Sequence, residues 1–174
     1  MKLLAKLIPA VLAVATAVCA CSSAPHTLDA STDKAASAHS SISQFSDVSG
    51  KEWLLVEIQT RPRNIVIDRA ALSEEGSNDI FTLRFEDGRI YGVGAPNRYT
   101  SSYTVEDQAI SINLIAGTLM APLFERKDLR ESEYYTYVQN AYQWDYSAEQ
   151  LKLYTKNAAG EEAVLVYSQG NAGK

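Results

Sequence analysis

Two alternating runs joined by Asp87-Gly88 place the tightest constraint on how this chain folds. In IFTLRFEDGRIYGVG, Phe81, Leu83 and Phe85 recur at every second position, so they share one face of a strand. Asp-Gly is among the strongest short signals for a hairpin, because the favoured two-residue turn needs positive φ at both positions. The sequence therefore predicts an antiparallel hairpin with one apolar face.

Short stretches rich in β-branched and aromatic residues flank this hairpin on both sides. Strands are predicted over 53–58 and 64–68, on both sides of a turn at 106–108, and over 151–155 and 163–168. Between them, the spacing of apolar residues changes to three and four, which predicts one helix over about 128–142 with Asp128 as its N-cap. We therefore expect an α+β fold: a curved antiparallel meander sheet packed against one main amphipathic helix, which is inserted before the last two strands.

The N-terminus has the pattern of a bacterial export signal. Lys2 and Lys6 are followed by an apolar run of about a dozen residues, whereas a helix that spans the membrane needs roughly 20. Residues 1–20 are therefore interpreted as a cleaved lipoprotein signal peptide. The expected location is the bacterial cell envelope, with a lipid anchor in the outer membrane if the organism has two membranes.

The end of this signal resembles a lipobox, in which Cys21 is the lipidated first residue of the mature chain. Cys19 is the competing position, but lipidation there would place the bulky Val18 at the cleavage site. Secretion without any lipid is the other alternative. An acylated Cys21 would hold the protein at the membrane, which is thus its first expected partner.

Residues 21–49 are predicted to be a disordered tether that begins with the lipidated cysteine. Nine Ser, two Thr and five Ala lie between residues 22 and 49, and such a composition cannot offset its ordering entropy. His26 and His39 lie here and are interpreted as solvated linker residues. The globular domain is expected over 50–169, with a disordered tail over 170–174.

Charge and residue content exclude several classes of function. Without the two lysines of the signal, the chain has 14 basic against 21 acidic residues, a net charge of −7, so sequence-independent nucleic-acid binding is not expected. Both His and both Cys precede residue 40, so the domain lacks an imidazole base, a thiol nucleophile and most zinc ligands. We expect neither a cofactor, a metal site nor an enzymatic activity.

The order of landmarks along the domain resembles the META domain, the HslJ-like (DUF306) lipoprotein family. The landmarks are Trp53, F-x-x-G-R-I-x-G (85–92), N-R-Y (97–99), T-x-M-A (118–121), E-x-x-Y (131–134) and L-x-L-Y (151–154). The resemblance implies a compact α+β envelope domain without an established enzymatic activity, loosely linked to heat response and drug tolerance. The family often has cysteines where this chain has Pro96 and Pro122. If they pair in relatives, this domain lacks a cross-link worth about 2–4 kcal/mol and should be softer.

All ten tyrosines fall in the second half of the chain, between Tyr91 and Tyr167. Tyr134 and Tyr142 are interpreted as core and rim residues of the helix. Tyr135 and Tyr137 point elsewhere on it, so at least one is expected to be exposed. They and N-R-Y form the candidate binding surface: Tyr135, Tyr137, Asn97, Arg98 and Tyr99.

Two non-enzymatic functions follow as expectations. In the first, the tethered domain binds or stabilises another envelope component, with a possible role in stress or drug tolerance. In the alternative, it is a carrier or pilot-like chaperone that holds a lipid or hydrophobic peptide between the sheet and the helix.

Overall fold

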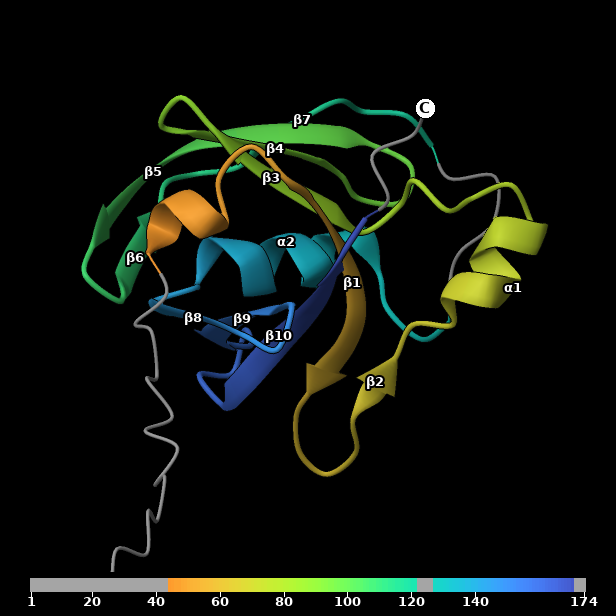
Figure 1. Ribbon diagram of the computed structural model, residues 1–174. Helices are drawn as coiled ribbons and strands as arrows, with labels where there is room; N and C mark the ends of the chain where they lie inside the picture. Colours follow the sequence, from red (N-terminus) through yellow and green to blue (C-terminus); the bar gives the residue numbers. More distant parts are fainter. Residues whose placement is uncertain (1–43, 122–126, 171–174) are drawn as a thin grey trace, which may run out of the picture. The chain divides into compact units, whose positions relative to one another are not determined.

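The computed structural model describes residues 44–121 and 127–170, which form antiparallel strands closed into a barrel (Figure 1). Eight strands make the barrel wall: β1 (Glu52–Gln59), β3 (Thr82–Glu86), β4 (Arg89–Val93), β5 (Arg98–Glu106), β6 (Ala109–Ile112), β8 (Gln143–Ser147), β9 (Gln150–Lys156) and β10 (Glu162–Gln169). Two short strands lie beside it, β2 (Ile65–Val66) on β1 and β7 (Ala116–Gly117) on β5. The helical elements are η1 (Phe45–Asp47), α1 (Arg69–Glu74) and α2 (Glu131–Gln139). No described helix has the length and apolar character needed to cross a membrane.

The barrel closes because the first and last strands pair with each other. β1 and β10 run antiparallel from Trp53 opposite Gln169 to Gln59 opposite Val164, with one irregularity between Leu55 and Glu57. At the other junction, β6 meets β8 in the pair Ala109–Gln143. Closure leaves no long unpaired strand edge within the wall.

The expected fold class is therefore wrong in two respects. The sheet is closed rather than an open curved meander, since β1 returns to pair with β10. The helix α2 has nine residues rather than the fifteen or so expected, and three strands follow it rather than two. Residues 143–147, at the end of the helical pattern, form β8, because Trp144 is buried against the barrel in a strand that pairs with β9.

Local hairpin predictions are confirmed. Asp87 and Gly88 both have positive φ and connect β3 to β4, while Asp107 has positive φ at the turn between β5 and β6. Phe81, Leu83 and Phe85 are all fully buried. The apolar face that alternation predicts is thus the inner face of the barrel.

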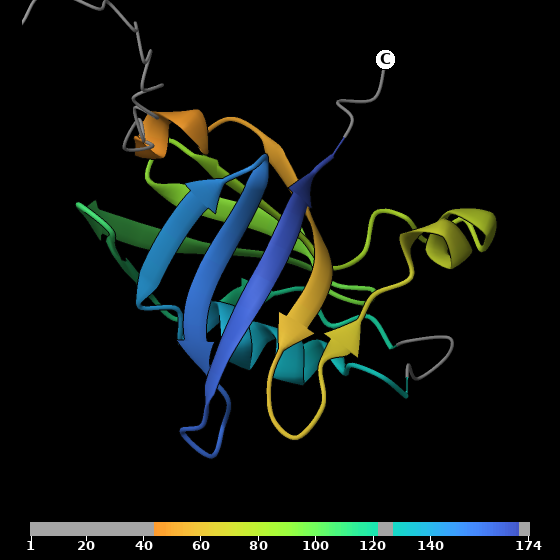
Figure 2. The same cartoon turned by 60° about the horizontal axis from the view of Figure 1, so that its bottom comes forward.

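The two ends of the barrel are covered differently. α2 lies between the strands β3–β5 and the strands β8–β10, toward the end with the β9–β10 loop (Figures 1 and 2). Its Tyr134 and Val138 side chains are fully buried. At the opposite end, η1 places Phe45 against the rings of Phe85 and Trp144, with centroids 5.0 and 5.1 Å apart.

The packed domain begins before the predicted boundary at Gly50. Val48 is fully buried, and its carbonyl accepts a hydrogen bond from Trp53 Nε1 at 3.0 Å. Phe45, which is partly buried, also packs against the core. Residues 1–43, with Cys19, Cys21, His26 and His39, lie outside the described residues, as do residues 171–174 of the predicted tail.

Candidate functional site

Asn97, predicted as a surface residue, is buried at the centre of a hydrogen-bond network. Its Oδ1 accepts from Thr118 Oγ1 at 2.7 Å and from the backbone N–H of Met120 at 2.6 Å. Its Nδ2 donates to the carbonyl of Met120 at 3.0 Å and to Glu131 Oε2 at 2.7 Å. All four hydrogen-bonding positions of the amide are satisfied, so Asn97 fastens two loops and the start of α2 together.

Glu131 completes this network from the first turn of α2. Its Oε1 accepts the backbone N–H groups of Ala95 and Asn97, both at 2.6 Å. A carboxylate is also favourable at this end of a helix, where the dipole is positive. The predicted N-cap Asp128 is wrong: the helix is capped at Arg130, whose N–H donates to Glu133 Oε2 at 3.0 Å.

A second buried network joins three tyrosine hydroxyls at the same end of the barrel. Tyr99 and Tyr134 both donate to the carbonyl of Thr82, at 2.8 and 3.0 Å. Tyr167 donates to the Tyr134 hydroxyl at 3.4 Å. Burial raises the pKa of Tyr134 to about 12 and raises the pKa values of Tyr99 and Tyr167 well above 10. All three phenols are therefore neutral at physiological pH and serve to hold the helix on the barrel.

The candidate binding surface does not exist as predicted. Tyr99 and Asn97 are 3 and 4 % exposed, and Tyr137 is 8 % exposed. Tyr135 is half-buried, because its hydroxyl donates to the carbonyl of Asn97 at 3.0 Å and its ring packs on Tyr99. Arg98 alone of the five is exposed. The physical reason is closure: strands lie on more than one side of α2, so tyrosines on several of its faces become buried.

Desolvation and the Glu131 carboxylate raise the pKa of Tyr135. Desolvation likewise raises the pKa of Tyr137. The prediction that Tyr134 belongs to the core is confirmed, since it is fully buried. Tyr142 is 42 % exposed, as expected of a rim residue, but it lies beyond α2, which ends at Gln139, rather than on the helix.

An accessible groove lies along the outer side of α2, with a volume of about 560 Å³. Its walls come from the start of the helix, from β2 and from the β9–β10 loop. We call it the α2 groove, and define it by the residues Ile65, Lys127, Asp128, Leu129, Arg130, Ser132, Glu133, Thr136, Tyr137, Asn157, Ala158 and Ala159. Tyr137, one of the predicted surface tyrosines, thus borders this groove.

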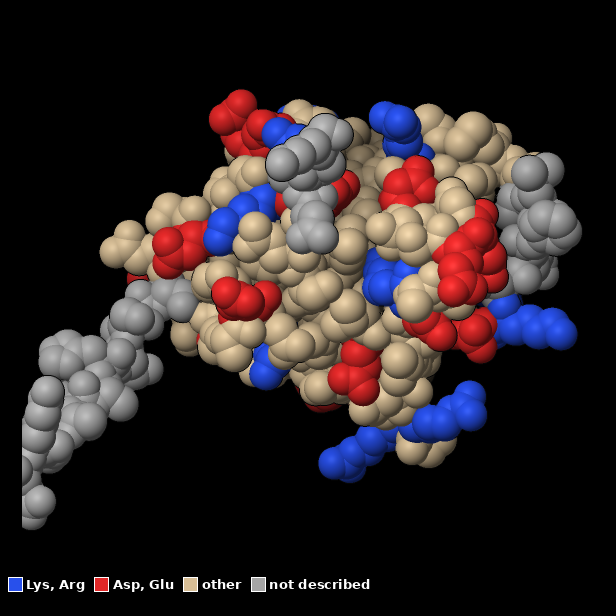
Figure 3. All heavy atoms as spheres, turned by 45° about the vertical axis from the view of Figure 1, so that its right-hand side comes forward, with Lys and Arg blue, Asp and Glu red and all other residues tan. Residues whose placement is uncertain are grey.

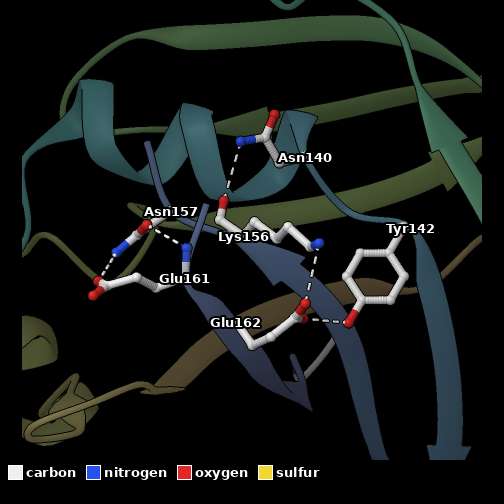
Figure 4. Close-up of polar contacts among 6 residues, drawn as sticks. All are labelled: Asn140, Tyr142, Lys156, Asn157, Glu161 and Glu162. Carbon is white, nitrogen blue, oxygen red and sulfur yellow. Dashed lines mark hydrogen bonds and ion pairs between the residues drawn. The ribbon is translucent and has the colours of Figure 1, made fainter. Parts of the chain in front are cut away.

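Side-chain hydrogen bonds make one wall of the α2 groove rigid (Figure 4). Asn157 Oδ1 accepts the N–H groups of Ala159 and Glu161 at 2.9 and 3.0 Å, and its Nδ2 donates to Glu161 Oε2 at 2.7 Å. Asn140, at the end of α2, donates to the carbonyl of Lys156 at 3.1 Å. The β9–β10 loop is therefore held in a fixed shape against the helix.

Glu162 lies just beyond this loop and is engaged by two donors (Figure 4). Tyr142 Oη donates to its Oε2 at 2.5 Å, and Lys156 Nζ lies 3.2 Å from its Oε1. The hydrogen bond from Tyr142 is the main cause of a lowered pKa of Glu162, and it also raises the pKa of Tyr142. Within the described part of the chain, His, Cys, Asp and Glu form no cluster of three that could hold a metal ion.

Sequence reasoning did not predict that Glu131 and Arg69 hydrogen-bond the backbone of distant segments. Arg69 donates from Nε to the carbonyl of Leu55 at 2.7 Å and from its terminal nitrogens to the carbonyls of Ile80 and Phe81 at 2.8 and 2.9 Å. No local pattern signals this role. Glu131, in contrast, lies within the E-x-x-Y landmark, and its carboxylate accepts hydrogen bonds from Asn97 of the N-R-Y landmark.

The chain was compared with protein-family models, with solved structures and with curated proteins. The family model for the META domain matches residues 46–169. An NMR structure of a protein from Burkholderia xenovorans is similar, with a TM-score of 0.52, 17% identity, and coverage of 72% of this chain and 86% of that one. A crystal structure of a DUF4847 family protein from Bacteroides vulgatus has a TM-score of 0.50, 13% identity, and coverage of 74% and 99%. At such identities, these likenesses concern the fold alone. No curated protein matches the chain.

Proposed function

The chain belongs to the META domain family, and on this basis we propose that it is a non-enzymatic, lipid-anchored bacterial envelope protein whose META domain binds another envelope component. The observation that carries the proposal is the α2 groove, which is open to solvent and large enough to receive side chains of a partner. Its lining mixes apolar residues such as Ile65 and Leu129 with charged ones such as Arg130 and Glu133. A mixed lining of this kind suits a protein surface, whose interfaces combine apolar contacts with hydrogen bonds.

The anchor in this proposal comes from the sequence pattern at Cys21. Acylation there would keep the domain at a membrane and therefore near its partner. The tether raises the effective concentration of the groove near a partner at the same membrane. The groove can therefore bind that partner even if its intrinsic affinity is modest.

The carrier alternative has less support from the packing. It would need space between the strands and α2, where the side chains of Tyr134 and Val138 are instead fully buried. The open space lies on the outer side of the helix, beside the exposed Ser132 and Glu133. We therefore propose surface binding rather than enclosure of a hydrophobic ligand.

Site-specific photo-cross-linking in living cells tests this function. A photoreactive residue at Ser132 or at Ala159 places the probe on either wall of the α2 groove, and both positions are exposed. Ser147, exposed at the end of β8, is the matched control. We expect the same discrete adduct from both groove positions and none from Ser147. Equal adduct patterns from all three positions would contradict binding at the groove.

A further inference from the structure

The loop between β1 and β2 forms a basic tip on an otherwise acidic protein. Arg61 and Arg63 flank Pro62, and all three residues are exposed. Within residues 44–121 and 127–170, neither arginine has an ion pair or a hydrogen bond. The loop projects beyond the strands that it connects (Figures 1 and 2), and Lys and Arg side chains extend from this lower edge of the domain (Figure 3).

The tip keeps its shape without using its arginines. Thr60 N–H donates to Asn64 Oδ1 at 3.3 Å, which joins the two ends of the loop. Asn64 Nδ2 in turn donates to Glu57 Oε1 at 2.9 Å, and Gln59 Nε2 donates to Glu57 Oε2 at 3.0 Å. The Glu57 carboxylate is thus hydrogen-bonded to side-chain amides rather than paired with Arg61 or Arg63, so both guanidinium groups are available to bind an external partner.

Two other carboxylates near the tip also form hydrogen bonds or ion pairs within the domain. Glu162 is engaged by Tyr142 and Lys156, and Glu161 by Asn157 (Figure 4). Glu162 and Arg61 border the same hollow, which has a volume of about 270 Å³. At physiological ionic strength, charges beyond about 8 Å are largely screened. Of these carboxylates only Glu162 is ion-paired among the described residues, with Lys156, whereas Glu57 and Glu161 keep their negative charge, so the positive charge of the tip lies on the exposed side chains of Arg61 and Arg63.

From these features we propose that the β1–β2 tip binds the phosphate groups of an anionic lipid surface. Guanidinium groups match phosphate oxygens in a bidentate geometry, and a projecting tip can reach a flat surface that a groove cannot. Val66, on the neighbouring β2 and three residues after Arg63, is 67% exposed and supplies an aliphatic side chain. Exposed apolar and basic side chains together are typical of segments that lie at a membrane interface.

The tip and the entry of the chain lie at opposite ends of the barrel. η1, where the described chain begins, covers one end, and the β1–β2 loop projects from the other (Figure 2). Contact of the tip with lipid would therefore orient the domain relative to its anchor. The inference rests on the proposed function only in placing a bilayer within reach, since the groove and the tip are separate surfaces.

Vesicle binding tests the inference with the chain from residue 22 to 174. This chain lacks the predicted lipid and retains every described contact, all of which lie within residues 44–170. The probes are phosphatidylcholine vesicles with and without an equal share of phosphatidylglycerol. We expect sedimentation with the anionic vesicles only, and loss of that binding at high salt.

The deciding variant is Arg61→Gln with Arg63→Gln. Each arginine near an anionic surface contributes about five-fold in affinity, so the double variant should bind about 25-fold more weakly. The matched control is Arg84→Gln with Arg89→Gln, which makes the same charge change on β3 and β4, where Arg84 pairs with Glu86 and Arg89 with Thr100. Circular dichroism confirms that each variant is folded.

Four outcomes would overturn the inference. They are equal binding to both kinds of vesicle, unchanged binding by the Arg61 and Arg63 double variant, an equal loss in the control, or binding of inorganic phosphate without binding of vesicles. None of them bears on cross-linking at the α2 groove, and a failure of cross-linking would leave vesicle binding by the tip intact.

Discussion

Glu131 accepts three hydrogen bonds from a loop more than thirty residues away, one of them from the side chain of Asn97 at 2.7 Å. The change Glu131→Gln replaces one acceptor oxygen with an amide that must donate, although its neighbours are donors themselves. Hydrogen bonds to a charged group contribute about 1.5–3 kcal/mol, and we expect a loss of stability in that range. Urea denaturation followed by fluorescence measures it.

The control for this variant is Glu133→Gln on the same helix. Glu133 is exposed and accepts from Arg130 N–H alone among its described contacts. Gln can make that same bond, so a loss of about 0.5 kcal/mol or less is expected. Similar losses from both variants would show that charge at the helix start matters, and not the network around Asn97.

Close packing against β3 and Tyr99 requires glycine at position 92. A Cβ at Gly92 would lie 2.2 Å from the carbonyl oxygen of Thr82 and 2.6 Å from the ring of Tyr99. Backbone cannot yield there, so Gly92→Ala should destabilise the domain by about 3 kcal/mol. Gly117→Ala is the matched control, because its nearest contact would be 3.5 Å away. Thermal unfolding compares the two, and equal melting temperatures would contradict this packing.

The buried phenols predict a loss of stability at alkaline pH. The pKa of Tyr134 is about 12 in the folded protein, against about 10 when unfolded. Below pH 10 both states are neutral and this stabilisation is complete. As the pH rises from 10 to 12, only the unfolded state ionises, so about 2–3 kcal/mol is lost. Denaturation at several pH values measures the slope.

Tyr134→Phe supplies the check on that assignment. Phe keeps the ring but cannot ionise, so the decline in stability between pH 10 and 12 should become shallower. Some decline should remain, because burial also raises the pKa values of Tyr99 and Tyr167. An unchanged slope would mean that other groups cause the alkaline loss.

Sequence reasoning worked where structure is set by neighbours along the chain. The Asp87-Gly88 hairpin and the inner face of Phe81, Leu83 and Phe85 follow from turn chemistry and alternation. Closure depends on the pairing of β1 with β10, which lie more than a hundred residues apart. No local pattern encodes that pairing, and therefore none could show that the tyrosines of α2 would be enclosed.

The candidate site was predictable only in part for the same reason. The prediction that at least one of Tyr135 and Tyr137 is exposed assumes that only one face of the helix meets a sheet. In the closed barrel, Tyr137 is buried and its carbonyl accepts a hydrogen bond from Thr155 Oγ1 on β9. The landmarks around Asn97, Thr118 and Glu131 were recognised as a set, but their shared network became visible only when the loops were brought together.

The contacts of η1 predict that residues before Gly50 stabilise the domain. Phe45 packs on the rings of Phe85, Tyr103 and Trp144, so Phe45→Ala should cost about 2 kcal/mol. The exposed Ser46 offers the control Ser46→Ala, which should change little. Urea denaturation of both variants measures the difference. Equal stability of the two variants would show that residues before Gly50 do not stabilise the domain.

Anchoring through Cys21 is tested by fractionation of cells. Cys21→Ala removes the thiol that the lipid would modify, while Cys19→Ala leaves it in place and serves as the matched control. We expect the Cys21 variant to lose incorporation of labelled fatty acid and the Cys19 variant to retain it, because a small residue must precede the modified cysteine and Ala20 meets that need only for Cys21. The reverse pattern would place the anchor at Cys19. Labelling of neither the wild type nor the variants would mean secretion without lipid, in which case the domain would reach its partner by diffusion instead of by a tether.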